Sequence, residues 1–213
     1  MSDEQALRAA LLDVSRRVVE LGLNRGTAGN ASVRCGEGLL ITPSALPVAE
    51  MTLASMVRMK LDGTVLQGSK PSSEWRFHCD ILKVRPEIGA VLHMHSPFAT
   101  TLACLRREVP AVHYMIALAG GDSIRCAPYS VFGEQQLSDD ALEALHGRKA
   151  CLLGNHGMIA LGTDLDDALA VAQEVEFLCE IYWRTLQAGT PQLLTAQQMY
   201  EVKQKFVDYK KRD

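Results

Sequence analysis

Apolar and polar positions along the first third of the chain change from helical to strand spacing. Apolar residues recur every three or four positions over residues 6–23, which predicts an amphipathic helix. Residues 24–30 are rich in glycine and asparagine and predict a turn. The short apolar runs at 31–34 and 39–42 flank a Gly-Glu-Gly sequence and therefore predict a β-hairpin. An alternating run at 57–61 predicts a further strand.

The rest of the chain alternates short apolar runs with longer amphipathic segments. The apolar runs, which predict strands, lie at residues 90–94, 124–127, 150–153 and 158–161. The amphipathic segments, which predict helices, lie at residues 74–84, 165–186 and 196–211, and a further helix is expected to begin at residue 97. Two serines before residue 74 suggest a helix cap. Because strands and helices are interspersed without a strict βαβ rhythm, we expect an α/β sandwich with a central sheet between helices.

Composition and charge narrow the class of protein. A chain of 213 residues with 47% hydrophobic residues suits a single compact domain, residues 1–213. The formal net charge of −3 offers no basic surface for nucleic acid, and no apolar run approaches the length of a membrane-spanning helix. The acidic N-terminal sequence does not resemble a secretory signal, and the six cysteines are scattered without a C-x-x-C pair. We therefore expect a cytoplasmic protein with reduced, buried thiols.

The motif His93-Met94-His95 is the strongest candidate for chemistry. In a strand these two imidazoles project from the same face, while Met94 points the other way. A third imidazole, His156, follows another predicted strand, and three imidazoles with one open position are common in catalytic zinc sites. Cobalt and manganese also accept such ligands. The same spacing fits two hydrogen-bonded core histidines, so spacing alone leaves both interpretations open.

The other histidines have weaker patterns. His78 lies one helical turn after Glu74 and could face the same site, although this spacing is common by chance and favours packing. His113 and His146 have no partner pattern and are expected at the surface or its boundary.

Three short segments offer donors for an anion. They are Gly29-Asn30 after a turn, Thr42-Pro43-Ser44-Ala45 after a strand, and Ser72-Ser73 at a helix start. Backbone N–H groups, hydroxyls and a helix N-terminus together can hold a phosphate without a lysine. Neither of the two glycine-rich nucleotide motifs is present, so nucleotide binding is not indicated.

Taken together, these segments resemble the class II aldolase/adducin family, and within it the branch of bacterial L-fuculose-1-phosphate aldolases. The resemblance spans nearly the whole chain. The matching stretches are residues 22–30, 41–44 and 71–78, the His93-x-His95 motif, and residues 113–117, 120–124, 126–129 and 156–157.

The resemblance implies a fold, a metal and an assembly. The fold is a three-layer sandwich whose central sheet is mostly antiparallel. The implied metal is one Zn²⁺ per subunit, held by His93, His95 and His156 with Glu74 as a fourth ligand in the resting site. Glu74 is then expected to leave the metal and act as acid or base. The family forms homotetramers whose sites lie at subunit boundaries.

The resemblance also implies roles for residues outside the metal ligands. The positions that match the phosphate- and substrate-binding residues are Gly29, Asn30, Ser44, Ala45, Ser72 and Ser73. Tyr114 matches a catalytic tyrosine that reaches a neighbouring subunit's site, and Tyr209 matches a second one less closely. Ala45 stands where glycine is usual, and Asn155 stands where histidine often precedes the metal ligand. Both departures bear on the aldehyde specificity.

The implied reaction is metal-dependent cleavage of a phosphorylated sugar. A ketose 1-phosphate resembling L-fuculose 1-phosphate would give dihydroxyacetone phosphate and a small aldehyde. The lysines lie in charged or terminal contexts, so Lewis-acid stabilisation by the metal suits the sequence better than a Schiff base. The nearest alternative substrates are 5-deoxyribulose 1-phosphate and 5-methylthioribulose 1-phosphate, with Phe132, Met115 and Tyr209 as candidates for an apolar aldehyde wall. Further alternatives are a phosphopentose 4-epimerase, a sugar-acid phosphate decarboxylase and a non-catalytic interaction domain that would lack the metal ligands.

Overall fold

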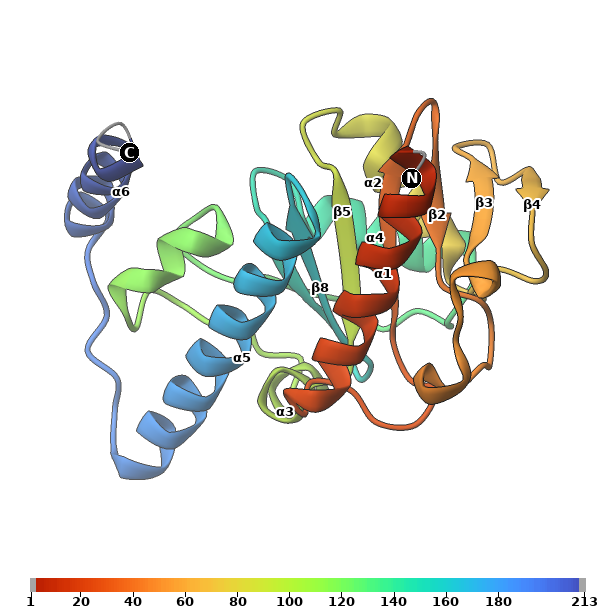
Figure 1. Cartoon of the computed structure of the whole chain (residues 1–213). Coiled ribbons are helices and arrows are strands. Elements are labelled where there is room, and N and C mark those ends of the chain that lie inside the picture. The colour runs from red at the N-terminus through yellow and green to blue at the C-terminus, as the bar shows by residue number, and fades with distance from the viewer. Residues whose placement is uncertain (1–2, 211–213) are drawn as a thin grey trace.

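A single eight-stranded sheet forms the centre of the molecule (Figure 1). The computed structural model describes residues 3–210, with side chains to residue 207. The strands run in the order β4-β3-β2-β1-β5-β8-β7-β6, and each neighbouring pair is antiparallel except β6 and β7. Their bounds are β1 Asn30–Cys35, β2 Gly38–Ile41, β3 Val57–Lys60, β4 Val65–Gln67, β5 Ala90–Met94, β6 Cys126–Ala127, β7 Ala150–Leu153 and β8 Gly157–Gly162.

Helices cover both faces of this sheet, which confirms the predicted three-layer α/β sandwich. On one face lie α1 (Asp3–Glu20), α3 (Pro97–Cys104) and α5 (Leu165–Ala188), and on the other lie α2 (Trp75–Val84) and α4 (Gln135–Ala144). The last helix, α6 (Ala196–Lys210), follows an extended linker and lies apart from the sheet (Figure 1). Short 3₁₀ helices occur at η1 (Val48–Glu50), η2 (Leu53–Ser55) and η3 (Tyr114–Ala119).

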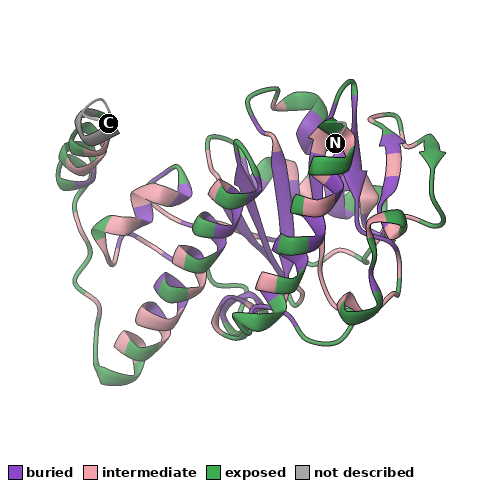
Figure 2. Ribbon diagram, viewed as in Figure 1, coloured by how far each residue is buried: buried purple, intermediate pink, exposed green. Residues whose placement is uncertain are grey.

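Alternation along β5 sends its side chains into two separate cores. Leu92 and Met94 are buried against the α1, α3 and α5 side, whereas Val91 is buried against the α2 and α4 side. His93 therefore shares a face with Val91, and its ring lies edge-on to Phe77 of α2 at 5.5 Å between centroids. Figure 2 shows these central strands as almost entirely buried. The sheet thus aims His93 toward α2, while Met94 packs in the opposite core as predicted.

Several predicted details differ in the structure. Within residues 3–210, strand β4 and helix α4 had no predicted counterpart, and the strand expected at 124–127 is reduced to β6. The expected serine cap of α2 is shifted: Glu74 occupies the N-cap position and makes no side-chain cap bond, while Oγ of Ser72 accepts a hydrogen bond from the N–H of Glu74 at 3.3 Å. The six cysteines are free, but Cys104 is exposed and Cys126 only half-buried, whereas the other four are buried as predicted. None of the helices within residues 3–210 combines the length and apolarity needed to cross a membrane.

Candidate metal centre

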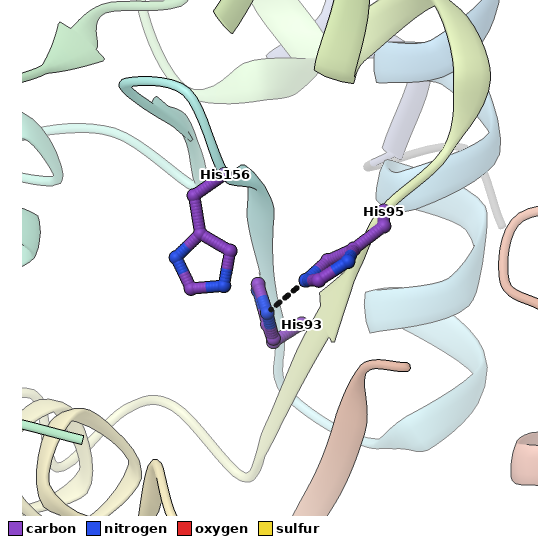
Figure 3. Close-up of side chains that lie close together, drawn as sticks. All are labelled: His93, His95 and His156. Carbon is purple, nitrogen blue, oxygen red and sulfur yellow. Dashed lines mark hydrogen bonds between the residues drawn. The ribbon is translucent and has the colours of Figure 1, made fainter. Parts of the chain in front are cut away.

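Three central strands and one helix start bring the candidate ligands together. His93 is in β5 and His95 follows that strand directly, whereas His156 lies in the turn between β7 and β8. Glu74 precedes α2, whose first turn reaches the same end of the sheet. Figure 3 shows the three imidazole rings pointing toward one another from β5 and the β7–β8 turn.

The distances within this cluster are those of potential ligands to one ion. The candidate ligand atoms of the three histidines all lie within 4.8 Å of one another. Nε2 of His93 lies 3.0 Å from Nε2 of His95. Glu74 spans the cluster, because Oε2 lies 3.3 Å from Nε2 of His93 and Oε1 lies 3.2 Å from Nε2 of His156. The structure thus brings all four predicted metal ligands together.

Protonation of the three histidines is disfavoured. Burial, followed by the neighbouring His95, lowers the pKa of His93 to about 3, and burial with the neighbouring His93 lowers that of His156 to about 4. Burial also lowers the pKa of His95. Nδ1 of His93 lies 2.9 Å from the carbonyl of Met158, so it carries the hydrogen and leaves a lone pair on Nε2. The cluster therefore presents neutral imidazole nitrogens, which is the form that binds metals.

One buried oxygen of Glu74 supports the fit to a cation. Oε1 is buried and has no hydrogen-bond partner among the described residues, although it lies near His156. A buried carboxylate oxygen without a donor is costly, and a divalent cation between it and the imidazole nitrogens removes that cost. Two or three neutral imidazoles with one carboxylate are typical donors for zinc. The residues present therefore fit a divalent metal ion.

Hydrogen bonds behind the cluster hold Glu74 in place. Nδ2 of Asn30 donates to Oε2 of Glu74 at 2.8 Å, and Oδ1 of Asn30 lies 2.5 Å from Nε2 of His78. The other ring nitrogen of His78 lies 2.7 Å from Oγ of Ser32. The packing interpretation of His78 is therefore incomplete, because its buried ring also makes two hydrogen bonds. Sequence spacing could not reveal this connection, since residues 30 and 78 meet only in the fold.

A polar cavity of about 330 Å³ opens beside the candidate ligands. Its lining includes all six predicted phosphate- and substrate-binding residues, namely Gly29, Asn30, Ser44, Ala45, Ser72 and Ser73, together with Glu74, His95 and His156. Thr27, Tyr129 and Ser130 also line the cavity and were missed as site residues. Asn155, noted above as a departure from the family pattern, lines it too, and so does Phe132, as the apolar-wall hypothesis suggested. Met115 packs against the core instead. Among the described residues that line the cavity, none is a lysine or an arginine.

Left-handed backbone shapes the edge of this cavity. Gly29 has a φ of 74°, and a Cβ there would lie 2.1 Å from Nδ2 of Asn24 and 2.6 Å from the carbonyl of His93. Only glycine fits at this position. Ala45 and Asn155, the two departures from the family pattern, have φ values of 55° and 54°. Asparagine tolerates this region better than alanine, so Ala45 is the more strained of the two.

The two predicted catalytic tyrosines are placed differently from the other site residues. Tyr114 begins η3, is about half exposed, and does not line the cavity of its own chain. Its ring lies against His113, at 4.7 Å, and stacks on Phe206 of α6 at 6.4 Å. The side chain of Tyr209 lies outside the described residues. His113 is half-buried and His146 exposed, as predicted.

Comparison with known proteins agrees with this fold and site. Residues 9–183 match the family described as Class II Aldolase and Adducin N-terminal domain. A solved structure of an L-fuculose 1-phosphate aldolase superposes with a TM-score of 0.92 at 37% identity and covers 97% of both chains. The chain therefore belongs to the class II aldolase and adducin family.

Two curated relatives narrow the class within this family. The chain is 54% identical over 204 residues, 96% of this chain and 92% of the other, to a 5-methylthioribulose-1-phosphate/5-deoxyribulose-1-phosphate aldolase of Rhodospirillum rubrum. It is 43% identical over 208 residues, 97% of both chains, to the L-fuculose phosphate aldolase of Escherichia coli. With its histidine triad, the chain is a metal-dependent class II aldolase, a carbon–carbon lyase. The identity is higher to the first relative than to the fuculose branch expected from the motifs.

Proposed function

We propose that this aldolase cleaves 5-methylthioribulose 1-phosphate or 5-deoxyribulose 1-phosphate to dihydroxyacetone phosphate and a short aldehyde. The observation that carries this proposal is the 54% identity, over nearly the whole chain, to an aldolase named for these two substrates. The exposed rings of Tyr129 and Phe132 at the cavity also suit an aldehyde that ends in an apolar group.

L-Fuculose 1-phosphate is the second candidate substrate. The TM-score of 0.92 to an L-fuculose 1-phosphate aldolase and the 43% identity to the Escherichia coli enzyme favour it. Both reactions share the phosphorylated half of the ketose and differ only in the aldehyde half. The two candidates therefore make the same demands on the metal ligands and the phosphate-binding residues.

His93, His95 and His156 would hold the metal, with Glu74 as the fourth ligand, and zinc is the ion that this donor set fits best. When bound, the ion supplies Lewis-acid polarisation of the substrate's carbonyl and hydroxyl oxygens. Glu74 then holds or moves the proton at the carbon that carries the developing charge. It is suited to this role because its carboxylate faces the imidazoles on one side and the cavity on the other.

The phosphate of the substrate would be held by neutral donors. Gly29, Asn30, Ser44, Ala45, Ser72 and Ser73 line the cavity. The backbone N–H groups of Ser44 and Ser72 already donate to the carbonyls of Lys70 and Thr42, so the amide of Asn30, the serine hydroxyls and the remaining N–H groups would supply the donors. Helix α2 begins at Trp75, two residues after Ser73, so its dipole favours an anion at this end. The left-handed backbone at Gly29 and Ala45 shapes the wall of the cavity at which the phosphate would bind.

Tyr114 would exchange a proton with the aldehyde oxygen in the site of a second copy, and Tyr209 would contribute to the same end. Tyr114 is exposed and is not among the residues that line the cavity of its own chain. A homotetramer with sites at subunit boundaries accounts for an exposed catalytic tyrosine. The complete site would then require residues from two chains.

A substrate screen tests the proposed function. The purified, zinc-loaded protein is incubated with each of the three ketose 1-phosphates, and dihydroxyacetone phosphate is measured with a coupled reductase. We expect the highest kcat/KM for one of the two 5-substituted ribulose 1-phosphates. Faster cleavage of L-fuculose 1-phosphate selects the second candidate. Consumption of substrate without free dihydroxyacetone phosphate, as an epimerase would give, overturns the aldolase proposal.

A further inference from the structure

A buried chain of hydrogen bonds lies behind Asn30, and the reaction described above makes no use of it. Ser32 and His78 are both fully buried. Ser32 lies two residues after Asn30 in β1, so both side chains project from the same face of the strand. His78 lies one turn after Glu74, in α2. The series of hydrogen bonds has three members. Oγ of Ser32 lies 2.7 Å from the ring of His78, the ring lies 2.5 Å from the amide oxygen of Asn30, and the amide nitrogen lies 2.8 Å from Glu74.

Only one set of hydrogen positions satisfies all three hydrogen bonds. The carboxylate of Glu74 accepts hydrogen bonds, so the NH₂ group of Asn30 must face it. The amide oxygen of Asn30 then faces His78, whose Nε2 must carry the hydrogen and donate. Nδ1 of His78 is consequently the acceptor, and the hydroxyl of Ser32 donates to it.

We propose that His78 is a positioning residue that fixes the orientation of the Asn30 amide, and through it the carboxylate of Glu74. The inference rests on the proposed function only in the roles given to Asn30 and Glu74. With the amide held in this way, one N–H binds Glu74 and the other remains available on the cavity side, where Asn30 lines the wall. Rotated by half a turn, the amide would place its oxygen against the carboxylate, which is repulsive.

The surroundings of His78 keep its ring in one orientation. The ring stacks on Phe77 at 4.6 Å between centroids, and Phe77 in turn lies edge-on to His93. A purely structural role would be met by any aromatic ring that stacks there. A positioning role requires the donor at Nε2 as well, so the two roles predict different outcomes for different substitutions.

Metal affinity measured without substrate separates the two roles. The probe is Co²⁺, titrated into the metal-free full-length protein in competition with a chromophoric chelator. His78→Phe keeps the stacking but removes the donor, and we expect about 10-fold weaker Co²⁺ binding, the low end for residues that orient metal ligands. His78→Gln supplies an N–H near the same point, so it should recover most of the loss. The proposal is overturned if both variants lose Co²⁺ affinity equally, or if His78→Phe loses none.

A double-mutant cycle tests whether His78 acts through Asn30. In an Asn30→Ala background the amide is absent, so His78→Phe should cause no further weakening of Co²⁺ binding. Fully additive losses overturn the proposal, because they show that His78 acts by another route. The kcat of the zinc-loaded variants should follow the same non-additive pattern.

Two further variants guard against a loss of folding. Ser138→Ala removes another fully buried hydroxyl, bonded to Asp80 in the α2–α4 layer, and should leave the Co²⁺ affinity unchanged. If His78→Phe does not fold, Ser32→Ala is used in its place. It should weaken Co²⁺ binding by less than about tenfold, and this effect should also disappear in the Asn30→Ala background. Unchanged affinity in Ser32→Ala then overturns the proposal. Because the Co²⁺ titrations use no ketose phosphate, their results stand even if the substrate screen fails.

Discussion

At the scale of single residues, Glu74 is the position on which the proposed chemistry depends. It is buried, it lies within 3.3 Å of two imidazole nitrogens, and one of its oxygens has no hydrogen-bond donor among the described residues. The side chain thus has two competing sets of partners, the candidate metal on one side and the amide of Asn30 on the other. Because Glu74 also lines the cavity, its carboxylate is placed to hold or move a proton of a bound substrate.

Glu74→Gln should lower kcat by about 10²- to 10⁴-fold, the contribution of a positioned acid or base. The amide retains the size of the carboxylate but cannot take up a proton. The measurement is kcat for the best ketose 1-phosphate, with metal content determined on the same sample. Normal turnover with a full complement of metal would contradict the assigned role.

The lowered histidine pKa values predict a pH-dependent stability in the metal-free protein. In the folded state the pKa of His156 is lowered to about 4, below the ordinary value of a histidine. At a pH between these two pKa values, the unfolded state therefore binds more protons than the folded state. Stability should therefore be lost as the pH falls from 7 to 5, by about 1–2 kcal/mol for this residue. Urea unfolding of chelator-treated protein measures the loss.

The matched controls for this pH effect are two histidine substitutions. His156→Asn should reduce the dependence of the unfolding free energy on pH, whereas His146→Asn, at an exposed position, should leave it unchanged. An identical pH dependence in His156→Asn and the unmodified protein would show that burial of this imidazole does not control the effect.

At the scale of elements, the N-terminus of helix α3, which follows His95, is capped by a side chain from another helix. Ser96 makes no side-chain cap bond to α3, and the carboxylate of Glu176 from α5 accepts hydrogen bonds from the N–H groups of Phe98 and Ala99 and the hydroxyl of Ser96. A negative charge at a helix N-terminus is favourable, and three bonds to it fix the segment that follows His95. Helix α5 therefore supports the site although it contributes no ligand.

Glu176→Ala should destabilise the protein by about 2–3 kcal/mol, because hydrogen bonds to a charged group are lost and buried donors are left without partners. Glu180→Ala is the control on the same helix. Glu180 pairs with the exposed Arg184, and such a surface pair contributes about 1 kcal/mol or less. Equal shifts in the urea midpoint of the two variants would contradict the capping role.

How far the sequence predicts these elements depends on where their apolar residues lie. The buried strands β5, β7 and β8 have continuous apolar runs, so their positions are close to those predicted. Strand β4 is exposed along its whole length and has no such pattern. Helix α4 buries Leu137, Ser138, Ala141 and Ala144, which are mostly small or polar, so its core-facing stripe is too weak to detect.

At the scale of the whole molecule, the site joins residues that are far apart in sequence. The H-x-H spacing predicts that His93 and His95 share a face, but spacing cannot show that Asn30 pairs with His93 across the sheet. That contact depends on strand register, and the link from Asn30 to His78 depends on how α2 packs. The resemblance to a family supplied the ligand set, and the physical reason for it became visible only in the fold.

The exposed position of Tyr114 predicts complementation between subunits. A Tyr114→Phe variant and a Glu74→Gln variant should each have low activity, because each would damage a different part of the site that we propose two chains share. Mixing the two, with dissociation and reassembly, should restore part of the activity in hybrid oligomers that contain intact pairs. Hybrids that form, as detected by mass spectrometry, but remain inactive would contradict a shared site.

The candidate ligands lie in the middle of the sheet, so a bound metal should affect how readily the sheet opens. Strands β1, β5 and β8 lie side by side at its centre, with partners on both edges. Their amide protons should exchange with deuterium only when the whole sheet opens, and bound metal should slow that exchange. The exposed edge strand β4 should exchange at the same rate with or without metal. Capture of the ion would therefore stabilise the folded state as a whole.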